Sequence, residues 1–133
     1  MTEPREPVRR VMSVGPITVD EKFTLRSLAA VLDELDVGVA LVARSDGSAA
    51  VVSERDVVRA LAQSAEPDEV WVADVMAQDL VIADPDEPLI DVGARMCDEG
   101  VRHVAVVDNG IVVGVVSARD LLDALVEHVQ TGV

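Results

Sequence analysis

The sequence predicts an α/β (α+β) fold made of two similar halves, each with the element order β-α-β-β-α. Three observations lead to this prediction. The chain repeats itself after 64 positions, the apolar periodicity changes in the same order in both copies, and each copy contains a turn typical of a β-hairpin. At 133 residues the chain is about one domain long, and neither half alone is long enough to bury much core.

The repeat covers nearly the whole chain. Residues 11–62 align with residues 75–126 without a gap, and the hexapeptide VVSERD at 51–56 returns as VVSARD at 115–120. We therefore expect an N-terminal tail at 1–7, a first repeat at 8–65, a linker at 66–74 and a second repeat at 75–130. Because the linker is short, the halves are expected to pack together with pseudo-two-fold symmetry.

Each predicted element occurs in both copies. A short β-type run opens each copy, at 17–19 and at 80–82. The helix that follows has one apolar face, formed by Leu25, Leu28, Leu32 and Leu35 and answered by Leu89, Val92 and Met96. Apolar runs then flank Ser45-Asp46-Gly47 in the first copy and Asp108-Asn109-Gly110 in the second, and Asn-Gly between β-branched residues predicts a hairpin. The closing helices are predicted by apolar residues at helical spacing, namely Val57, Val58, Leu61 and Ala62, matched by Leu121, Leu122, Leu125 and Val126.

Composition argues against several classes of function. The formal net charge of -14, with one Lys and ten Arg, disfavours nucleic acid and anionic membranes as partners. The uncharged stretches are shorter than the roughly 20 residues of a membrane span, and the N-terminal residues do not resemble a secretory signal. We therefore expect a cytoplasmic protein. The single cysteine, Cys97, excludes an internal disulfide and a Cys-rich metal site, and no other metal site is predicted.

The recurring Ser-x-x-Asp allows two interpretations. Ser53 and Ser117 each precede a predicted helix, and Asp56 and Asp120 follow three residues later, which is close to a helix-capping box. The same residues suit a ligand, since an ionised Asp can accept two hydrogen bonds from a vicinal diol and a helix N-terminus favours a phosphate. Capping alone would account for the motif, and both roles can coexist.

The sequence resembles a tandem pair of CBS (cystathionine β-synthase) domains, an arrangement called a Bateman module, over about residues 8–130. The most specific segments are RRVMSVGPITV and ADVMAQDLVIA at the openings, VVSERDVVRAL in the first copy, and DEGVRHVAVVDNGIVVGVVSARDLLDAL in the second. The resemblance implies a stand-alone CBS protein that binds AMP, ADP, ATP or S-adenosylmethionine in a cleft between the two motifs. It also implies a homodimer.

The family pattern marks ligand-binding positions in both copies. In the second copy these are Gly114, Ser117, Asp120, the neighbouring Arg119, the possible phosphate or ribose contact His103, and Val81 and Ile82 around the base. In the first copy they are Ser53, Asp56, Arg55, Ile17 and Thr18, and Ala50 stands where the family usually has Gly. Since Gly114 would let a ligand approach the backbone closely, we expect the second site to be the occupied one if only one is.

Three further features have simpler structural interpretations. His103 is expected to be a partly buried residue with local hydrogen bonds, if it does not contact a ligand. Cys97 is expected to face the core, so a Cys97–His103 nucleophile–base pair is rejected. Paired acids such as Asp86-Glu87 are expected to be solvated, and arginines of the N-terminal tail to be mobile if they do not pair with a second subunit.

The leading functional hypothesis is a non-enzymatic sensor that binds an adenosine-type ligand and reports to an unknown protein partner. No catalytic residues are assigned and no cofactor is required, beyond an adenine nucleotide or S-adenosylmethionine as regulatory ligand. The alternative is a dimeric protein–protein interaction adaptor with a degenerate ligand site. A small enzyme using Cys97 or His103 is the third and least favoured possibility.

Overall fold

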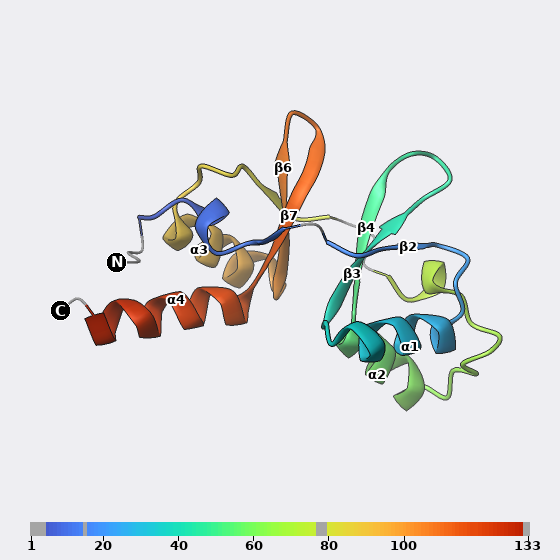
Figure 1. Cartoon of the computed structure of the whole chain (residues 1–133). Coiled ribbons are helices and arrows are strands. Elements are labelled where there is room, and N and C mark those ends of the chain that lie inside the picture. The colour runs from blue at the N-terminus through green and yellow to red at the C-terminus, as the bar shows by residue number, and fades with distance from the viewer. Residues whose placement is uncertain (1–4, 15, 77–79, 132–133) are drawn as a thin grey trace. The chain divides into compact units, whose positions relative to one another are not determined.

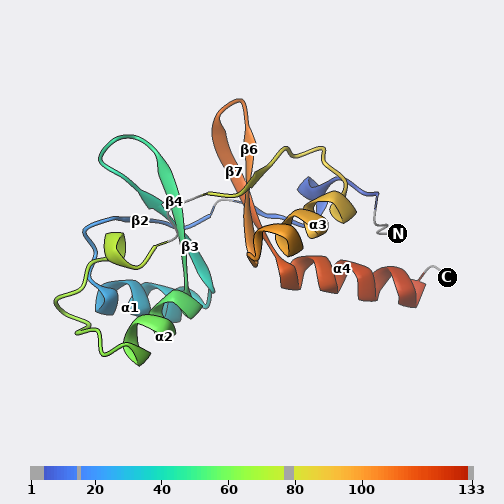
Figure 2. The ribbon, with the colours of Figure 1, turned by 180° about the vertical axis from the view of Figure 1, so that it is seen from behind.

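The computed structural model describes residues 5–14, 16–76 and 80–131, and for His128 the backbone alone. The chain forms two compact units, shown from opposite sides in Figures 1 and 2. The middle unit comprises Ile17–Leu80, and the outer unit combines the residues up to Pro16 with those from Val81 onward. Each unit is a small sheet covered on one face by two helices, which confirms the predicted α/β class.

In the middle unit, the sheet has the order β2-β3-β4. Strand β2 (Thr18–Asp20) runs parallel to β3 (Val39–Ala43), which is antiparallel to β4 (Ala49–Ser53). Helices α1 (Leu25–Leu35) and α2 (Glu54–Ala62) cover one face of this sheet, as Figure 1 shows. Their buried side chains, among them Leu28 and Ala60, meet those of alternate strand residues such as Val42 and Val52. The residues that alternate with these point to the other face of the sheet, where Leu41 is buried as well.

In the outer unit, the sheet has the order β1-β7-β6-β5. Strand β5 (Ile82–Ala83) is parallel to β6 (His103–Asp108), which is antiparallel to β7 (Ile111–Ser117). Helices α3 (Leu89–Glu99) and α4 (Ala118–Thr131) cover one face. The fourth strand, β1 (Ser13–Val14), was not predicted from the sequence and pairs antiparallel with β7.

Local chemistry accounts for the element boundaries. Asn109 and Gly110 both have positive φ (52° and 79°), as a two-residue turn between β6 and β7 requires, so the predicted hairpin is confirmed. Thr24 caps α1 by accepting a hydrogen bond from the backbone N–H of Ser27 (3.1 Å). Helix α3 ends at Gly100, whose φ of 68° is the left-handed conformation in which helices commonly stop.

The two structural units do not coincide with the two expected sequence repeats, because the opening of the first repeat belongs to the outer unit. Val8, at the start of a short 3-10 helix (Val8–Arg10), is fully buried in the core of the outer unit. Its backbone N–H donates to the carbonyl of Glu87 (2.8 Å), and that of Arg9 donates to the carbonyl of Pro85 (3.1 Å). Residues 5–14 are therefore part of the outer unit; of the expected tail at 1–7, residues 1–4 lie outside the described part of the chain.

The segment expected as a linker packs onto the middle unit. Val72 is fully buried in its core, and its backbone N–H donates to the carbonyl of Phe23 (2.8 Å). Each unit is thus completed by residues from the opening of the other sequence repeat. Among the described residues, no helix is long and apolar enough to cross a membrane.

Candidate functional site

Both Ser-x-x-Asp motifs form the predicted caps. In the middle unit, Asp56 Oδ2 accepts from the backbone N–H of Ser53 (2.8 Å), and Ser53 Oγ accepts from that of Asp56 (3.3 Å). In the outer unit, the equivalent distances between Ser117 and Asp120 are 2.8 and 3.0 Å. The capping interpretation is therefore correct for both copies. The cap uses one carboxylate oxygen of each Asp and leaves the other oxygen for a second partner.

Several expected site residues of the outer unit share the sheet face that the helices leave uncovered. His103 lies directly opposite Ser117 in the β6–β7 register, and Ile82 lies opposite Ala105 on the neighbouring strand. Because residues two apart along a strand face the same side, His103 and Ala105 point to the face opposite Val104 and Val106, where Ala105 is fully buried and His103 is partly exposed. The register therefore brings Ile82, His103 and Ser117 to one face, with Ile82 half exposed.

The middle unit has a matching face with different chemistry. Thr18 lies opposite Leu41, and Ser53 lies opposite Val39, so all four residues share the face without helices. Val39 occupies the position that His103 has in the outer unit, which leaves this face without a histidine. The two faces thus have the same strand arrangement but carry different polar side chains.

Two of the expected base-enclosing residues, Ile17 and Val81, also contribute to the cores and the sheets. Ile17 and Val81 are partly buried and pack against the cores of their own units. Their carbonyls accept backbone hydrogen bonds from Leu41 (2.7 Å) and Ala105 (3.0 Å), which extend the parallel strand pairs. Arg55 and Arg119, by contrast, are exposed at the first turns of α2 and α4.

The carboxylates of the two motifs differ in their surroundings. Asp56 Oδ1 lies 3.7 Å from the guanidinium of Arg59, one turn along α2. The residue at the corresponding place on α4 is Asp123, and Asp120 Oδ1 has no hydrogen-bond or ion-pair partner within the described residues. Asp120 therefore keeps a more available negative oxygen than Asp56.

The structure gives a packing reason for a glycine at position 114, which the sequence did not reveal. A Cβ at this position would lie 2.6 Å from Met12 Sδ and 2.8 Å from the backbone oxygen of Ser13, because β1 crosses close to β7 here. The close approach that we expected from a ligand is thus made by the chain itself. Ala50, its counterpart on β4, is fully buried in the core of the middle unit.

An ion pair missed by sequence analysis fixes the loop after β5. Both Glu87 oxygens accept from Arg95 (2.5 and 2.9 Å), and Arg95 also donates to the carbonyl of Ile82 (2.8 Å). The Arg95 hydrogen bonds hold the pKa of the Glu87 carboxyl below its usual value, although partial burial opposes this shift. The expectation that Glu87 is merely solvated is therefore wrong. Its neighbour Asp86 is exposed but pairs with Arg9.

Cys97 does not face the core, contrary to our expectation. It is exposed on α3, beside the buried Met96. Periodicity placed it incorrectly because Val92 and Met96 define the buried stripe, and position 97 falls just outside it. Within the described ranges, no group of three or more His, Cys, Asp or Glu residues is arranged to hold a metal ion.

Comparison with known proteins decides the family. The CBS domain profile matches residues 8–63 and 72–127, one match for each sequence repeat. The chain belongs to the CBS domain family. Modules of this family are generally regulatory rather than enzymatic.

Two known proteins are similar to most of the chain. Uncharacterized protein MJ1225 of Methanocaldococcus jannaschii is 32% identical over 133 residues, which are 96% of this chain and 47% of that protein. The chain thus spans about half the length of this curated relative. The CBS domain protein PAE2072 from Pyrobaculum aerophilum, solved in complex with AMP, is 30% identical with a TM-score of 0.79, and the match covers 94% of this chain and 99% of that one.

A second solved structure supports the same fold. The CBS domain pair of protein MJ0100, in complex with 5-methylthioadenosine and S-adenosyl-L-methionine, has a TM-score of 0.82 at 24% identity. The match covers 93% of this chain and 98% of that one. Both CBS pairs were thus solved with adenosine-type ligands.

Proposed function

We propose that this protein is a regulatory module that binds an adenosine-containing ligand of the AMP, ADP, ATP or S-adenosylmethionine type and signals to a protein partner. The observation that carries the proposal is the grouping of Ser117, Asp120 and His103 in the outer unit. His103 and Ser117 are direct register partners, and Asp120 is held by Ser117 with one oxygen still available. The AMP complex of the 30% identical PAE2072 supports the ligand class.

The chemistry of these groups suits a nucleoside. Asp120 Oδ1 can accept hydrogen bonds from ribose hydroxyls while Oδ2 keeps the N-cap of α4. The first turn of α4 offers unpaired N–H groups and partial positive charge to a phosphate, and the exposed Arg119 can add a charge-assisted bond. The half-exposed Ile82 offers apolar surface to the base. Gly114 does not by itself favour this motif over the first, because Met12 and Ser13 lie where its Cβ would point.

The middle unit offers a second candidate site of weaker affinity, formed by Ser53, Asp56, Arg55 and Thr18. The guanidinium of Arg59 offsets the charge of Asp56, and Val39 stands where the outer unit has His103. Both differences reduce the polar contacts available to a ribose phosphate. We also propose that the protein works as a homodimer, with the ligand changing its interaction with the partner.

A thermal-shift comparison of AMP with 2′-deoxy-AMP tests the proposed contact. Ligands that bind the native state alone raise the melting temperature. We expect AMP, or another member of the ligand class, to raise it, and the 2′-deoxy analogue of the same ligand to do so at concentrations at least tenfold higher, since one ribose hydroxyl is lost. Equal shifts for the two compounds would refute the contact between Asp120 and the ribose 2′-hydroxyl. No shift with any adenosine compound would refute the ligand class.

One observation favours the alternative, a dimeric adaptor with a degenerate site. Both Ser-x-x-Asp motifs are satisfied internally as capping boxes, so they have a structural purpose without ligand. An adaptor would capture its partner equally with or without nucleotide. Partner capture that is unchanged by AMP and by substitutions at Asp120 would select this function.

A further inference from the structure

Arg95 connects the strand that carries Ile82 to the loop that follows this strand. Its Nη1 donates hydrogen bonds to the backbone carbonyl of Ile82 (2.8 Å) and to Glu87 Oε2 (2.9 Å), and its Nη2 donates to Glu87 Oε1 (2.5 Å). Glu87 Oε2 also accepts from the backbone N–H of Asp84 (2.8 Å). The guanidinium is therefore oriented by both oxygens of a carboxylate that the loop itself holds.

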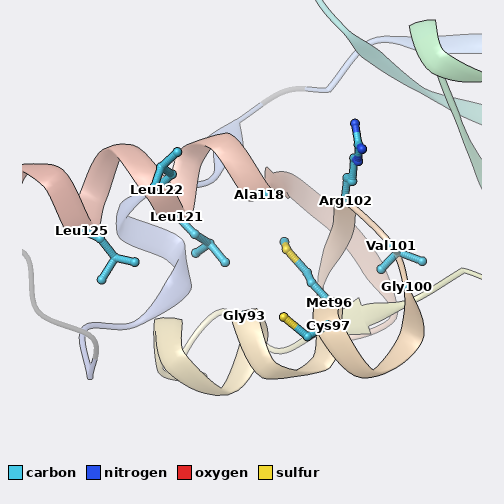
Figure 3. A pocket seen from close by; sticks show the side chains of 10 residues that line it. All are labelled: Gly93, Met96, Cys97, Gly100, Val101, Arg102, Ala118, Leu121, Leu122 and Leu125. Atoms are coloured by element: carbon cyan, nitrogen blue, oxygen red, sulfur yellow. The ribbon is translucent and has the colours of Figure 1, made fainter.

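These contacts lie on a different side of α3 from the one that faces α4. Figure 3 shows Gly93, Met96 and Cys97 of α3 along the groove beside α4, and Arg95 is not among the residues that line this groove. Successive helix residues are turned by about 100°, so Arg95 projects from another side than Met96. Its guanidinium bonds to the strand and the loop that precede α3.

The carbonyl that Arg95 holds points to the free edge of the sheet. Strand β5 is an edge strand of two residues, Ile82 and Ala83. The carbonyl of the preceding Val81 accepts from the backbone N–H of Ala105 on β6, and successive carbonyls of a strand point to opposite sides. The carbonyl of Ile82 is thus directed away from β6, and Arg95 takes the place that a further strand would have.

The first sequence repeat lacks this contact. Phe23 and Val31 stand where the second repeat has Glu87 and Arg95. Both are partly buried and pack against the core of the middle unit, so apolar packing replaces the ion pair. No guanidinium at position 31 can hold the edge of the corresponding strand, β2. The two candidate ligand sites therefore differ in how the strand beside the base is held.

The position of β5 matters because Ile82 offers apolar surface to the base in the proposed site. Its side chain is 49% exposed on the sheet face that also carries His103 and Ser117. A half-exposed side chain on a two-residue strand makes few packing contacts of its own, so its place depends on how the backbone is held. A strand that is fixed before the ligand arrives lowers the cost of ordering on binding.

We propose that Arg95 is a positioning residue of the outer ligand site, which acts on the base through Ile82 without touching the ligand. This inference rests on the proposed function and deepens it, since it names the residue that prepares the surface for the base. The ribose and phosphate contacts are made by Ser117, Asp120 and the first turn of α4, which Arg95 does not contact. Removing Arg95 therefore weakens the base-dependent part of binding and spares the rest.

Calorimetric titration of Arg95→Met with AMP and with ribose 5-phosphate tests this role. Methionine keeps the length of the side chain and removes its donors. Every sample is the whole chain with Asp56→Asn, which weakens the second candidate site, and this chain without further change is the reference. We expect Arg95→Met to raise the dissociation constant of AMP about tenfold, and that of ribose 5-phosphate, measured by competition with AMP, less than about twofold. Arg95→Lys keeps a charged donor and should bind AMP within about threefold of the reference.

Two control variants separate positioning from a general loss of stability. Glu87→Gln removes the charge of the ion-pair partner but leaves Arg95 able to donate to the carbonyl of Ile82, so AMP should bind within about threefold of the reference. Arg26→Met breaks another two-bond pair with a carboxylate, that with Asp68 in the middle unit (2.6 and 3.2 Å). It should leave both dissociation constants unchanged.

Hydrogen exchange of the backbone amides of residues 80–84, measured without ligand, reports on β5 itself. Exchange should be faster in Arg95→Met and unchanged in Arg26→Met. Unchanged AMP affinity in Arg95→Met, or an equal loss for AMP and ribose 5-phosphate, would overturn this inference and leave the proposed function standing. A wild type that binds no adenosine compound would refute the proposed function and the positioning role together, and faster exchange would then mark the contact between Arg95 and β5 as structural only.

Discussion

Replacing Gly114 by Ala tests whether β1 belongs to the sheet of the outer unit. The new Cβ would meet Met12 Sδ at 2.6 Å and the Ser13 carbonyl oxygen at 2.8 Å, where ordinary contacts are 3.4 Å or longer. The Met12 side chain can rotate away, but the Ser13 oxygen is backbone and is held by pairing of β1 with β7. Inserting a methyl group into such a site costs typically 1–3 kcal/mol, and we expect the upper half of this range, about 2–3 kcal/mol.

Urea unfolding followed by circular dichroism, without ligand, measures this cost. Gly93→Ala is the matched control, because its Cβ would meet only Leu121 Cδ1 at 3.5 Å and it lies inside helix α3. The Gly93→Ala control should be as stable as wild type or more stable by up to about 1 kcal/mol, since Ala has a higher helix propensity than Gly. Adding Met12→Ala to Gly114→Ala should recover only part of the loss.

A Gly114→Ala variant as stable as wild type would refute this packing. If that variant had also lost AMP binding, the glycine would serve a ligand, as the sequence had suggested. Trp71, the only tryptophan, lies in the middle unit. Its fluorescence therefore reports whether the damage stays in the outer unit.

Three further predictions concern individual contacts. Val8→Ala should lower the free energy of unfolding by about 2 kcal/mol, because it removes two methyl groups from a fully buried position, whereas an exposed Val8 would give no change in the same urea titration. Ser117→Ala should cost about 1 kcal/mol of stability through loss of the α4 cap, and an unchanged melting curve would contradict the capping geometry. Glu87→Gln should destabilise the protein at neutral pH. The pKa of Glu87 is lower in the folded than in the unfolded protein. The difference in stability between wild type and variant should therefore be fully present above the unfolded pKa of about 4.3 and vanish as the pH falls through the folded pKa. A stability difference that does not depend on pH would exclude the ion pair with Arg95.

The sequence predicted the elements well because their signals are local. Asn109-Gly110 specifies a two-residue turn by its own backbone preference, and Ser117 and Asp120 form a cap within one helical turn. The 64-residue repeat doubled each of these signals. Fold class and the two motif geometries could therefore be predicted from the sequence alone.

Long-range features could not be derived in the same way. Two similar repeats can each keep their own opening segment or exchange it, and the apolar pattern is the same in both cases. The burial of Val8 beside the second repeat, and of Val72 beside the first, therefore became visible only in the structure. The reason for Gly114 depends on this exchange, since Met12 and Ser13 come from the opening of the chain. Arg95 and Glu87 were missed because an ion pair between a helix and its preceding loop leaves no periodic signal.

The measurement that tests the proposed function most directly is a calorimetric titration of wild type, Asp120→Asn and Asp56→Asn with AMP and S-adenosylmethionine. Asparagine keeps the size of the side chain and an acceptor oxygen for the cap, and it removes the charge. We predict that wild type binds at least one of these ligands, that Asp120→Asn weakens binding at least tenfold, and that Asp56→Asn has a smaller effect. Wild-type binding retained in Asp120→Asn, or no binding by wild type, would contradict the assignment.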